Sequence, residues 1–123
     1  MEKKDNTRSL GNSEERRAAE FLEDNGCRII ERNFSCRAGE IDLIYYDEDN
    51  VICFGEVKYR YDENAGYPSE AVDIRKQRKI CRVSDMYRAK FSLDESYSYR
   101  YDVIAIKRNE IQWIKNAFYY IER

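Results

Sequence analysis

Acidic residues stand at positions of this 123-residue sequence where strand patterns predict buried side chains. Asp42 lies in one apolar run, and Glu56 and Lys58 lie in the next, on the face that also carries Ile52 and Phe54. A charge in such a position costs free energy unless it is paired or binds a metal ion. If a hairpin brings Asp42 beside Glu56, the two carboxylates repel, and the pKa of one rises unless a divalent cation lies between them.

A carboxylate pair of this kind suits Mg²⁺ or Mn²⁺. Mg²⁺ takes oxygen ligands, often from only one or two carboxylates, and keeps several waters. It can activate water and stabilise charge on a phosphodiester, and a neighbouring lysine can assist the nucleophile or the developing charge. The residues therefore predict hydrolysis without histidine, which the sequence lacks. The alternative is that Glu56 and Lys58 neutralise each other, or mark where the strand emerges into water.

A further carboxylate precedes the apolar stripe of the first predicted helix. Glu15 lies three, four and seven residues before Ala18, Ala19 and Leu22, so helical spacing puts it on their inward face. It either directs a third carboxylate at the sheet or, as the third residue after an Asn12 cap, bonds back to the backbone of the cap.

Two neighbouring charged residues are accessory candidates. Strand alternation puts Glu40 on the same face as Asp42 and Ile44. The same alternation puts Arg60 on the face of Glu56.

The second predicted helix carries an excess of positive charge. Between residues 74 and 90, seven lysine and arginine residues stand against one aspartate. Like charges at helical spacing repel, so contact with a polyanion such as nucleic acid would explain the stripe, while a solvated face is the alternative. The stripe consists of four residues: Arg75, Arg78, Lys79 and Arg82.

Composition excludes several classes of protein. With 42% hydrophobic and 37% charged residues, the chain should fold as one domain, and its net charge of −2 means that nucleic-acid binding needs a local basic patch. The absence of histidine excludes Ser-His and Cys-His catalysis and every zinc site that uses histidine. The four cysteines contain no CxxC spacing, which predicts ordinary buried or half-buried thiols. No apolar stretch suits a signal sequence or a membrane span, so a cytoplasmic location is expected.

The elements that must position the acids follow from periodicity and turn signals. The expected order is α-β-β-β-α-β-β, an α/β fold with a central mixed sheet flanked by helices. The turn at residues 47–50 should make a hairpin of the second and third strands. Residues 1–10 are expected as a flexible arm, and residues 11–123 as a single domain. The expected elements are a helix from Asn12 to Asn25, strands 27–34, 39–46 and 51–60, a loop 61–69, a helix 70–90, and strands 99–107 and 111–115 around an Asn109 turn.

Aromatic residues gather near the C-terminus. Tyr97, Tyr99 and Tyr101 alternate along one predicted strand face, and residues 118–120 read Phe-Tyr-Tyr. Core or interface packing is the expected role, with base stacking as the alternative. Asp102 is expected to pair with Arg100.

The motifs resemble the YraN family of uncharacterised bacterial proteins, in register over residues 11–118. That family is similar to the PD-(D/E)xK nuclease superfamily and to archaeal Holliday-junction resolvases. The resemblance implies a restriction-endonuclease-like fold with metal bound at the hairpin. The matching residues are Gly11, Glu15, Ala18, Ala19, Leu22, Gly26, Glu31-Arg32-Asn33, residues 39–44, Glu56-Val57-Lys58, Arg60, residues 100–103 and residues 116–118.

Carried over residue by residue, the resemblance implies an active site. The helix glutamate falls on Glu15, the first metal-binding aspartate on Asp42, and the Glu-x-Lys pair on Glu56 and Lys58. The carbonyl of Val57 is a further candidate ligand.

Two residues depart from the family pattern. Glu14 replaces a glycine that commonly precedes the helix glutamate, and Gly55 replaces a usual valine before Glu56.

The sequence thus predicts a Mg²⁺- or Mn²⁺-dependent endonuclease acting on DNA, with branched or structured DNA as the favoured substrate and a homodimer as the form that symmetric cutting would need. Two other classes remain open. One is a non-catalytic nucleic-acid-binding or assembly protein on a nuclease-like scaffold. The other is a protein-interaction domain that uses the tyrosine-rich C-terminus.

Overall fold

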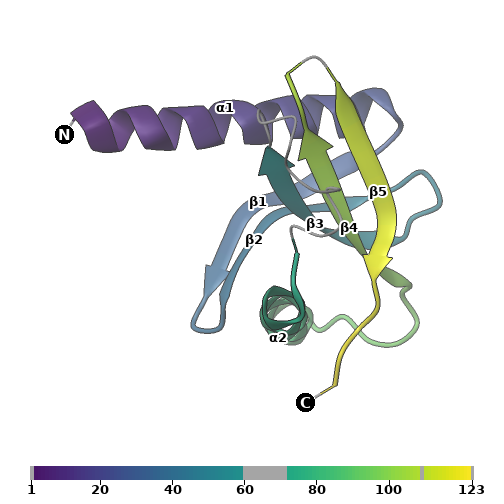
Figure 1. The fold of residues 1–123 in the computed structure, drawn as a ribbon. Coiled ribbons are helices and arrows are strands. Elements are labelled where there is room, and N and C mark those ends of the chain that lie inside the picture. Colours follow the sequence, from purple (N-terminus) through teal and green to yellow (C-terminus); the bar gives the residue numbers. More distant parts are fainter. Residues whose placement is uncertain (1, 60–71, 109, 123) are drawn as a thin grey trace.

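The computed structural model describes residues 2–59, 72–108 and 110–122, with side chains from Ser13 onward. The observed order of elements is the predicted α-β-β-β-α-β-β (Figure 1). The elements are α1 (Glu2–Asp24), β1 (Arg28–Cys36), β2 (Gly39–Tyr46), β3 (Ile52–Tyr59), α2 (Ile74–Lys90), β4 (Tyr99–Ile106) and β5 (Ile111–Phe118).

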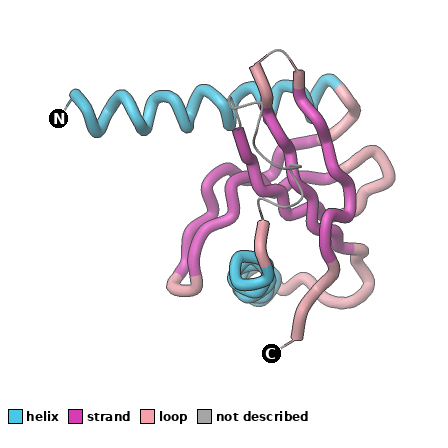
Figure 2. Tube along the Cα trace, in the orientation of Figure 1, coloured by secondary structure: helices cyan, strands magenta, loops and turns pink. Residues whose placement is uncertain are grey.

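The strands form one mixed sheet in the order β1-β2-β3-β4-β5. β1, β2 and β3 are antiparallel neighbours, β3 and β4 are parallel, and β5 returns antiparallel to β4. Parallel strands need a crossover, and α2 lies between β3 and β4 in the chain. α1 and α2 lie on opposite sides of the sheet (Figures 1 and 2), so the predicted α/β architecture is confirmed.

The two faces of the sheet have separate cores. On the α1 side, Ala18 and Leu22 pack with Leu43 and other apolar residues, and on the α2 side Ile80 and Val83 pack with Phe34, Phe54 and others. β3 contributes to both cores because alternate residues of a central strand point to opposite faces. Burial on both faces is what its apolar pattern predicted.

The start of α1 differs from the prediction. The helix begins at Glu2, so Asn12 lies inside it and does not cap it, because the polar residues before Asn12 include no proline to stop a helix. The capping role considered for Glu15 is excluded with it. The residues predicted as an arm form the first turns of α1, which extend past the sheet in Figure 1. The flexibility of these residues stays a prediction. The predicted end at Asn25 and Gly26 is confirmed, with Gly26 at φ +90°.

α2 begins later than predicted. Asp73 is its N-cap, and the Asp73 side chain accepts a hydrogen bond from the Lys76 amide at 2.8 Å. β5 continues past the expected end at residue 115 to Phe118. Arg60, the loop 61–69 and the turn residue Asn109 lie outside the described residues.

A buried aspartate ties β4 to its neighbours. Asp102 accepts hydrogen bonds from the Tyr45 hydroxyl at 2.5 Å, Arg100 Nε at 2.8 Å and Trp113 Nε1 at 3.0 Å. The backbone amide of Asn116 donates to it at 2.9 Å. The predicted Arg100–Asp102 pair is confirmed, and it belongs to a network that spans β2, β4 and β5.

Gly55 makes room for part of this network. A Cβ atom on Gly55 would lie 2.9 Å from Tyr45 Cε1 and 3.0 Å from Ile104 Cδ1. The Tyr45 ring therefore fills the space that a valine side chain would use at position 55.

Two features that composition addressed are the state of the cysteines and the apolar character of the helices. Cys27, Cys53 and Cys81 are buried free thiols, and Cys36 is half-buried, as predicted. Among the described residues, no helix combines the length and the apolar character needed to cross a membrane.

Candidate active site

β2 and β3 separate at the position of Asp42. Their backbone ladder ends at the Leu43–Gly55 pair. Asp42 Oδ2 then accepts a hydrogen bond from the Val57 amide at 2.8 Å. The Asp42 side chain thus takes the place of a backbone acceptor and holds the two strands at a fork.

β1 is irregular opposite the same point. Asn33 lies between the paired residues Arg32 and Phe34 and has φ +54°, a left-handed conformation that asparagine tolerates better than most residues. Its side chain hydrogen-bonds to the Glu15 carboxylate. Asn33 is among the residues that carry the family resemblance, but no role was predicted for it, although an asparagine inside a strand pattern is unusual enough to signal an irregularity.

The fork breaks the alternation expected for β2. Ile41 and Ile44 both pack in the core on the α2 side, whereas Leu43 packs on the α1 side. The expectation that Glu40, Asp42 and Ile44 share one face is therefore wrong. Strict alternation needs regular strand geometry, which is lost opposite the left-handed backbone of β1.

The hairpin brings Asp42 beside Glu56, as predicted. Burial, followed by the charge of Asp42 and a hydrogen bond with its carboxyl group, raises the pKa of Glu56 to about 8. Lys76 and Lys58 act in the opposite direction. At neutral pH the carboxyl group of Glu56 therefore carries a proton.

Glu15 approaches this acid pair from α1. Its Oε2 atom is buried and has no hydrogen-bond partner among the described residues. Burial and the charge of Asp42 raise the pKa of Glu15, while the hydrogen bond with Asn33 lowers it. A buried oxygen of this kind has the capacity to accept a hydrogen bond or a cation from outside the chain.

Glu40 lies at the rim of the site. Its side chain is exposed and accepts a hydrogen bond from Ser35 Oγ at 3.0 Å. Its charge contributes to the raised pKa of Glu15. Glu14, which precedes Glu15 in α1, is buried and forms an ion pair with Arg17 at 3.2 Å.

Two lysines face the acid pair. Lys58 is half-buried near the end of β3, and Lys76 Nζ lies 3.8 Å from Glu56 Oε2. Within the described part of the chain, the ion pair of Glu56 is thus with Lys76 and not with Lys58. Lys76 was not predicted as a site residue, because it stands next to Arg75 in a basic segment. A helix turns about 100° per residue, so Lys76 points toward the sheet while Arg75 points to solvent.

The acids fit a small, partly hydrated cation. Across residues 2–59, 72–108 and 110–122, no three Asp, Glu or Cys side chains are grouped closely enough to hold one metal ion together. Mg²⁺ commonly uses one or two carboxylates and completes its shell with water and substrate phosphate. Two carboxylates such as Asp42 and Glu56 suit that arrangement, whereas the described residues offer no cage made only of protein ligands.

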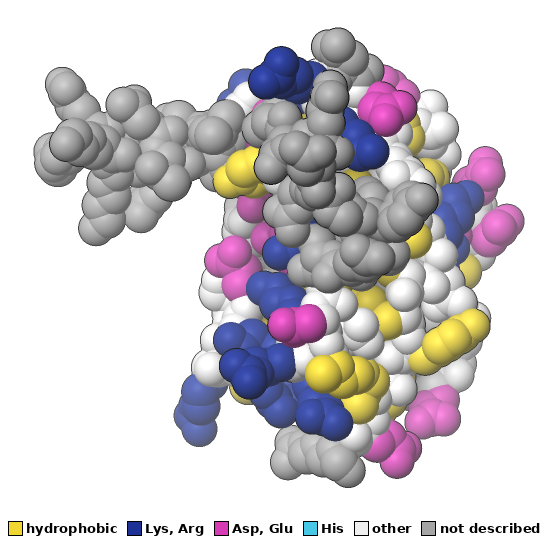
Figure 3. All heavy atoms as spheres, viewed as in Figure 1, with side chains coloured by type: hydrophobic (Ala, Val, Ile, Leu, Met, Phe, Trp, Pro, Cys, Tyr) yellow, Lys and Arg dark blue, Asp and Glu magenta, His cyan; other side chains and the backbone are white. Residues whose placement is uncertain are grey.

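The basic stripe lies on the exposed face of α2. The aliphatic stem of Lys79 packs against the β1–β2 hairpin at Gly39. A Cβ atom on Gly39 would lie 3.1 Å from that stem. In Figure 3, Lys and Arg side chains gather over the region of α2. Because Lys76 belongs to the first turn of the same helix, the stripe begins beside the acid pair. All four residues of the stripe are exposed: Arg75, Arg78, Lys79 and Arg82.

The chain has close relatives in several bacteria. Residues 14–106 match the profile of the Uncharacterised protein family UPF0102, and this range contains the acid pair, Glu15 and both lysines. A UPF0102 protein of Lachnoclostridium phytofermentans is 41% identical over 113 residues, which cover 92% of this chain and 95% of the relative. One from Caldicellulosiruptor saccharolyticus is 44% identical over 119 residues, covering 92% and 99%. One from Stutzerimonas stutzeri is 39% identical over 116 residues, covering 91% and 96%. The chain therefore belongs to family UPF0102, the YraN family that its motifs resemble.

Proposed function

We propose that this protein is a metal-dependent nuclease that hydrolyses phosphodiester bonds in DNA, with branched or otherwise structured DNA as its substrate. The observation that carries the proposal is the Asp42–Glu56 pair, two adjoining carboxyl groups at the strand fork, with the pKa of Glu56 raised to about 8 by burial and by Asp42. Such a pair has few internal partners, and a divalent cation would remove the repulsion between its charged forms.

Each acidic group has a defined part in the proposed site. Asp42 and Glu56 would bind Mg²⁺ or Mn²⁺ directly, the Val57 carbonyl would add a ligand, and Glu15 would act through water. An ion bound there supplies an activated water and neutralises charge on the phosphate. The hydrogen bond from the Val57 amide holds the Asp42 carboxylate in one orientation before any ligand arrives. This preorganisation favours binding because less side-chain freedom is lost.

Lys58 is the residue that we assign to the attacking water. It extends from the end of β3, two residues after Glu56, and its charge lowers the pKa of that acid. An ammonium group at this position can orient the water and stabilise the charge that develops on the phosphate oxygens.

The basic stripe would bind the phosphates that flank the reacting bond. Each phosphate contact that is lost should reduce the slope of log K against log salt by about 0.9 for duplex DNA. A variant that replaces Arg78 and Arg82 by glutamine should therefore bind less tightly and with a smaller salt slope. An unchanged slope would exclude the stripe from the DNA contact.

One observation supports a second candidate, a nucleic-acid-binding protein without catalysis. Lys76 places a cation 3.8 Å from Glu56, so the acid pair has one internal counterion in the absence of metal. If that arrangement persists when DNA is bound, the chain would bind structured DNA and leave it intact.

A single-turnover cleavage assay separates the two functions. Labelled single-stranded, duplex, flap and four-way-junction DNA would be incubated with Mn²⁺ and wild type, Asp42→Asn or Lys58→Ala. Asp49→Asn, an exposed acid in the turn of the same hairpin, is the matched control. Nuclease function predicts cleavage by wild type and control, and loss of cleavage with retained binding in the two site variants. Junction binding without cleavage, unchanged by Asp42→Asn or chelator, would favour the non-catalytic protein.

A further inference from the structure

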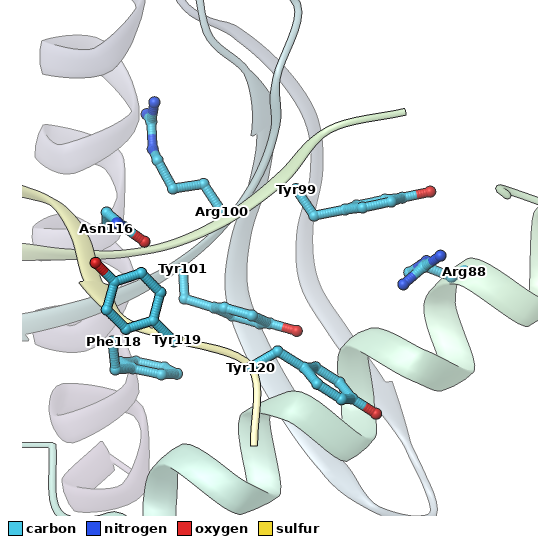
Figure 4. A pocket seen from close by; sticks show the side chains of 8 residues that line it. All are labelled: Arg88, Tyr99, Arg100, Tyr101, Asn116, Phe118, Tyr119 and Tyr120. Carbon is cyan, nitrogen blue, oxygen red and sulfur yellow. The ribbon is translucent and has the colours of Figure 1, made fainter. Parts of the chain in front are cut away.

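A concave site lies at the far end of α2 from the acid pair. Its volume is about 300 Å³, near the lower limit for ligand pockets. Lys76 in the first turn of α2 contacts Glu56, whereas Arg88 in the last turn lines this pocket. The lining residues come from α2, β4, β5 and the following segment (Figure 4): Arg88, Tyr99, Arg100, Tyr101, Asn116, Phe118, Tyr119 and Tyr120.

Aromatic rings form the floor of the pocket. Tyr101 and Phe118 stack with ring centroids 5.1 Å apart, and Tyr99 stacks on Phe54 at 6.3 Å. The guanidinium of Arg100 is already engaged by Asp102 and by another aspartate, and in Figure 4 it points away from these rings. The charge at the pocket therefore comes from Arg88.

Arg88 has an unused hydrogen-bond donor. Its guanidinium lies over the Tyr99 ring at 4.0 Å from the centroid. Its Nε atom is buried and has no acceptor among the described residues. A buried donor without a partner costs free energy, so a ligand that brings an acceptor to Arg88 would gain from the contact.

The rim of the pocket is aromatic and open to solvent. Tyr119 is 76% exposed, and Tyr120 is also exposed, with its hydroxyl donating to Asp85 at 2.8 Å. Exposed tyrosines beside an arginine suit a flat ring that stacks and also carries hydrogen-bond acceptors. A nucleobase has both properties, and stacking on aromatic side chains is the general way in which unpaired bases bind.

The pocket and Glu56 of the acid pair lie on the same face of the sheet. Tyr99, Tyr101 and Phe118 belong to the core on the α2 side with Phe54, which shares its strand face with Glu56. From residue 76 to residue 88 the helix advances about 18 Å at 1.5 Å per residue. That length corresponds to roughly five nucleotides at a rise of about 3.4 Å.

We infer that this pocket binds one unpaired base of a nucleic-acid strand that runs along α2 from the acid pair. The inference rests on the proposed function, because it is the proposed nuclease substrate that supplies the strand. It narrows the substrate to DNA with an unpaired base about five nucleotides from the scissile phosphate, as at a bulge, flap or open junction.

The test uses a fluorescent base analogue in the presence of chelator. The full chain would be titrated into a duplex that carries one unpaired 2-aminopurine, whose fluorescence falls when the base stacks. Tyr119→Ala and Arg88→Gln remove pocket contacts, and Tyr97→Ala is the control, since Tyr97 is 43% exposed and does not line the pocket. Both pocket variants should bind about tenfold less tightly and lose the quenching, whereas the control should match wild type.

Three results would overturn the inference. The first is quenching in both pocket variants equal to that in Tyr97→Ala. The second is equal affinity for a fully paired duplex and the bulged one. The third is displacement of the bulged duplex by a free nucleoside monophosphate at a concentration equal to that of the duplex. That result would assign the pocket to a small molecule. Thermal unfolding of each variant checks its fold, and Arg88→Lys replaces Arg88→Gln if the latter is unfolded.

The two proposals can fail separately. Pocket-dependent quenching in a protein that cleaves nothing with Mn²⁺ would support the pocket and contradict the nuclease. Cleavage that depends on Asp42, together with quenching that ignores Tyr119 and Arg88, would do the reverse.

Discussion

Two buried carboxylates on neighbouring parallel strands have opposite surroundings. Asp102 of β4 is 1% exposed, and Glu56 of β3 is 7% exposed. Asp102 accepts hydrogen bonds from Arg100, Trp113 and two further donors, so its charge is compensated inside the fold. Glu56 lies against the carboxyl group of Asp42, with one ion pair at 3.8 Å.

The difference shows that burial of an acid does not reveal its role. Asp102 has the donors that a structural carboxylate needs, and none of its capacity is left for a ligand. Glu56 carries a proton at neutral pH because burial and the charge of Asp42 raise its pKa more than Lys76 and Lys58 lower it. An incompletely compensated acid is the one that gains most from an external cation.

Removal of the Asp102 carboxylate should have the largest effect on stability. Asp102→Ala removes the acceptor of the Trp113 and Tyr45 donors and leaves Arg100 with Asp47 as its remaining acidic partner among the described residues, and we expect the free energy of unfolding to fall by about 3–5 kcal/mol. Asp42→Asn, which relieves repulsion with Glu56, should change it by less than about 1 kcal/mol. Urea unfolding of both variants measures the contrast, and equal losses would remove the distinction between the two acids.

Neutralising Glu56 should change how stability depends on pH. Because its pKa rises from 4.5 to about 8 on folding, the folded protein holds the proton more tightly than the unfolded chain. This contribution is complete below pH 4.5 and is lost as pH rises through about 8. Over that range the free energy of unfolding of wild type should fall by a few kcal/mol, on the order expected for such a shift.

Glu56→Gln should abolish this decline, because glutamine stays neutral beside Asp42, Lys58 and Lys76. Unfolding in urea at several pH values tests it, with the exposed Glu48→Gln as the matched control. A decline that persists unchanged in Glu56→Gln would assign the titration to another group.

A side chain at Gly55 should disturb the hydrogen-bond network of Asp102 and lower stability. An alanine there would crowd Tyr45 and Ile104, and we expect a loss of about 1–3 kcal/mol in the free energy of unfolding. The hydrogen bond from Tyr45 to Asp102 should weaken as the ring moves. Stability equal to that of wild type in Gly55→Ala would mean that the ring has free space elsewhere.

The smallest effect is expected at Lys76. Its ion pair with Glu56 is long and partly exposed, so Lys76→Met should change the free energy of unfolding by less than about 1 kcal/mol. The charge of Lys76 lowers the pKa of Glu56, and its removal should therefore move the midpoint of the pH-dependent decline to higher pH. A midpoint that stays in place would show that the lysine does not act on this acid.

Local patterns predicted much of the fold and part of the site. Alternation in β3 placed Glu56 and Lys58 on the face of Phe54, and the turn at 47–50 correctly implied a hairpin that joins Asp42 to Glu56. Helical spacing identified the exposed stripe of α2. These features depend on residues within a few positions of one another, and periodicity describes them well.

The remaining features depend on contacts between distant segments. The strand fork is held by the hydrogen bond from the Val57 amide to Asp42. Opposite Asp42, the left-handed backbone of Asn33 interrupts the regular alternation that sequence patterns assume for a strand. Lys76 reaches Glu56 only through the packing of α2 on the sheet. The partners of Asp102 come from several strands, so sequence predicted only its neighbour Arg100.

Calorimetric titration with Mn²⁺ tests the central claim most directly, that the Asp42–Glu56 pair is a cation site while Asp102 belongs to the fold. Wild type, Asp42→Asn and Glu56→Gln would be titrated at a pH near 8, with Asp49→Asn as the control and unfolding curves to verify each fold. If the pair is a cation site, binding should be saturable in wild type and control and should be lost in both site variants, whose stability should be unchanged or higher. Binding of equal affinity in all four proteins, or in none of them, would contradict that claim.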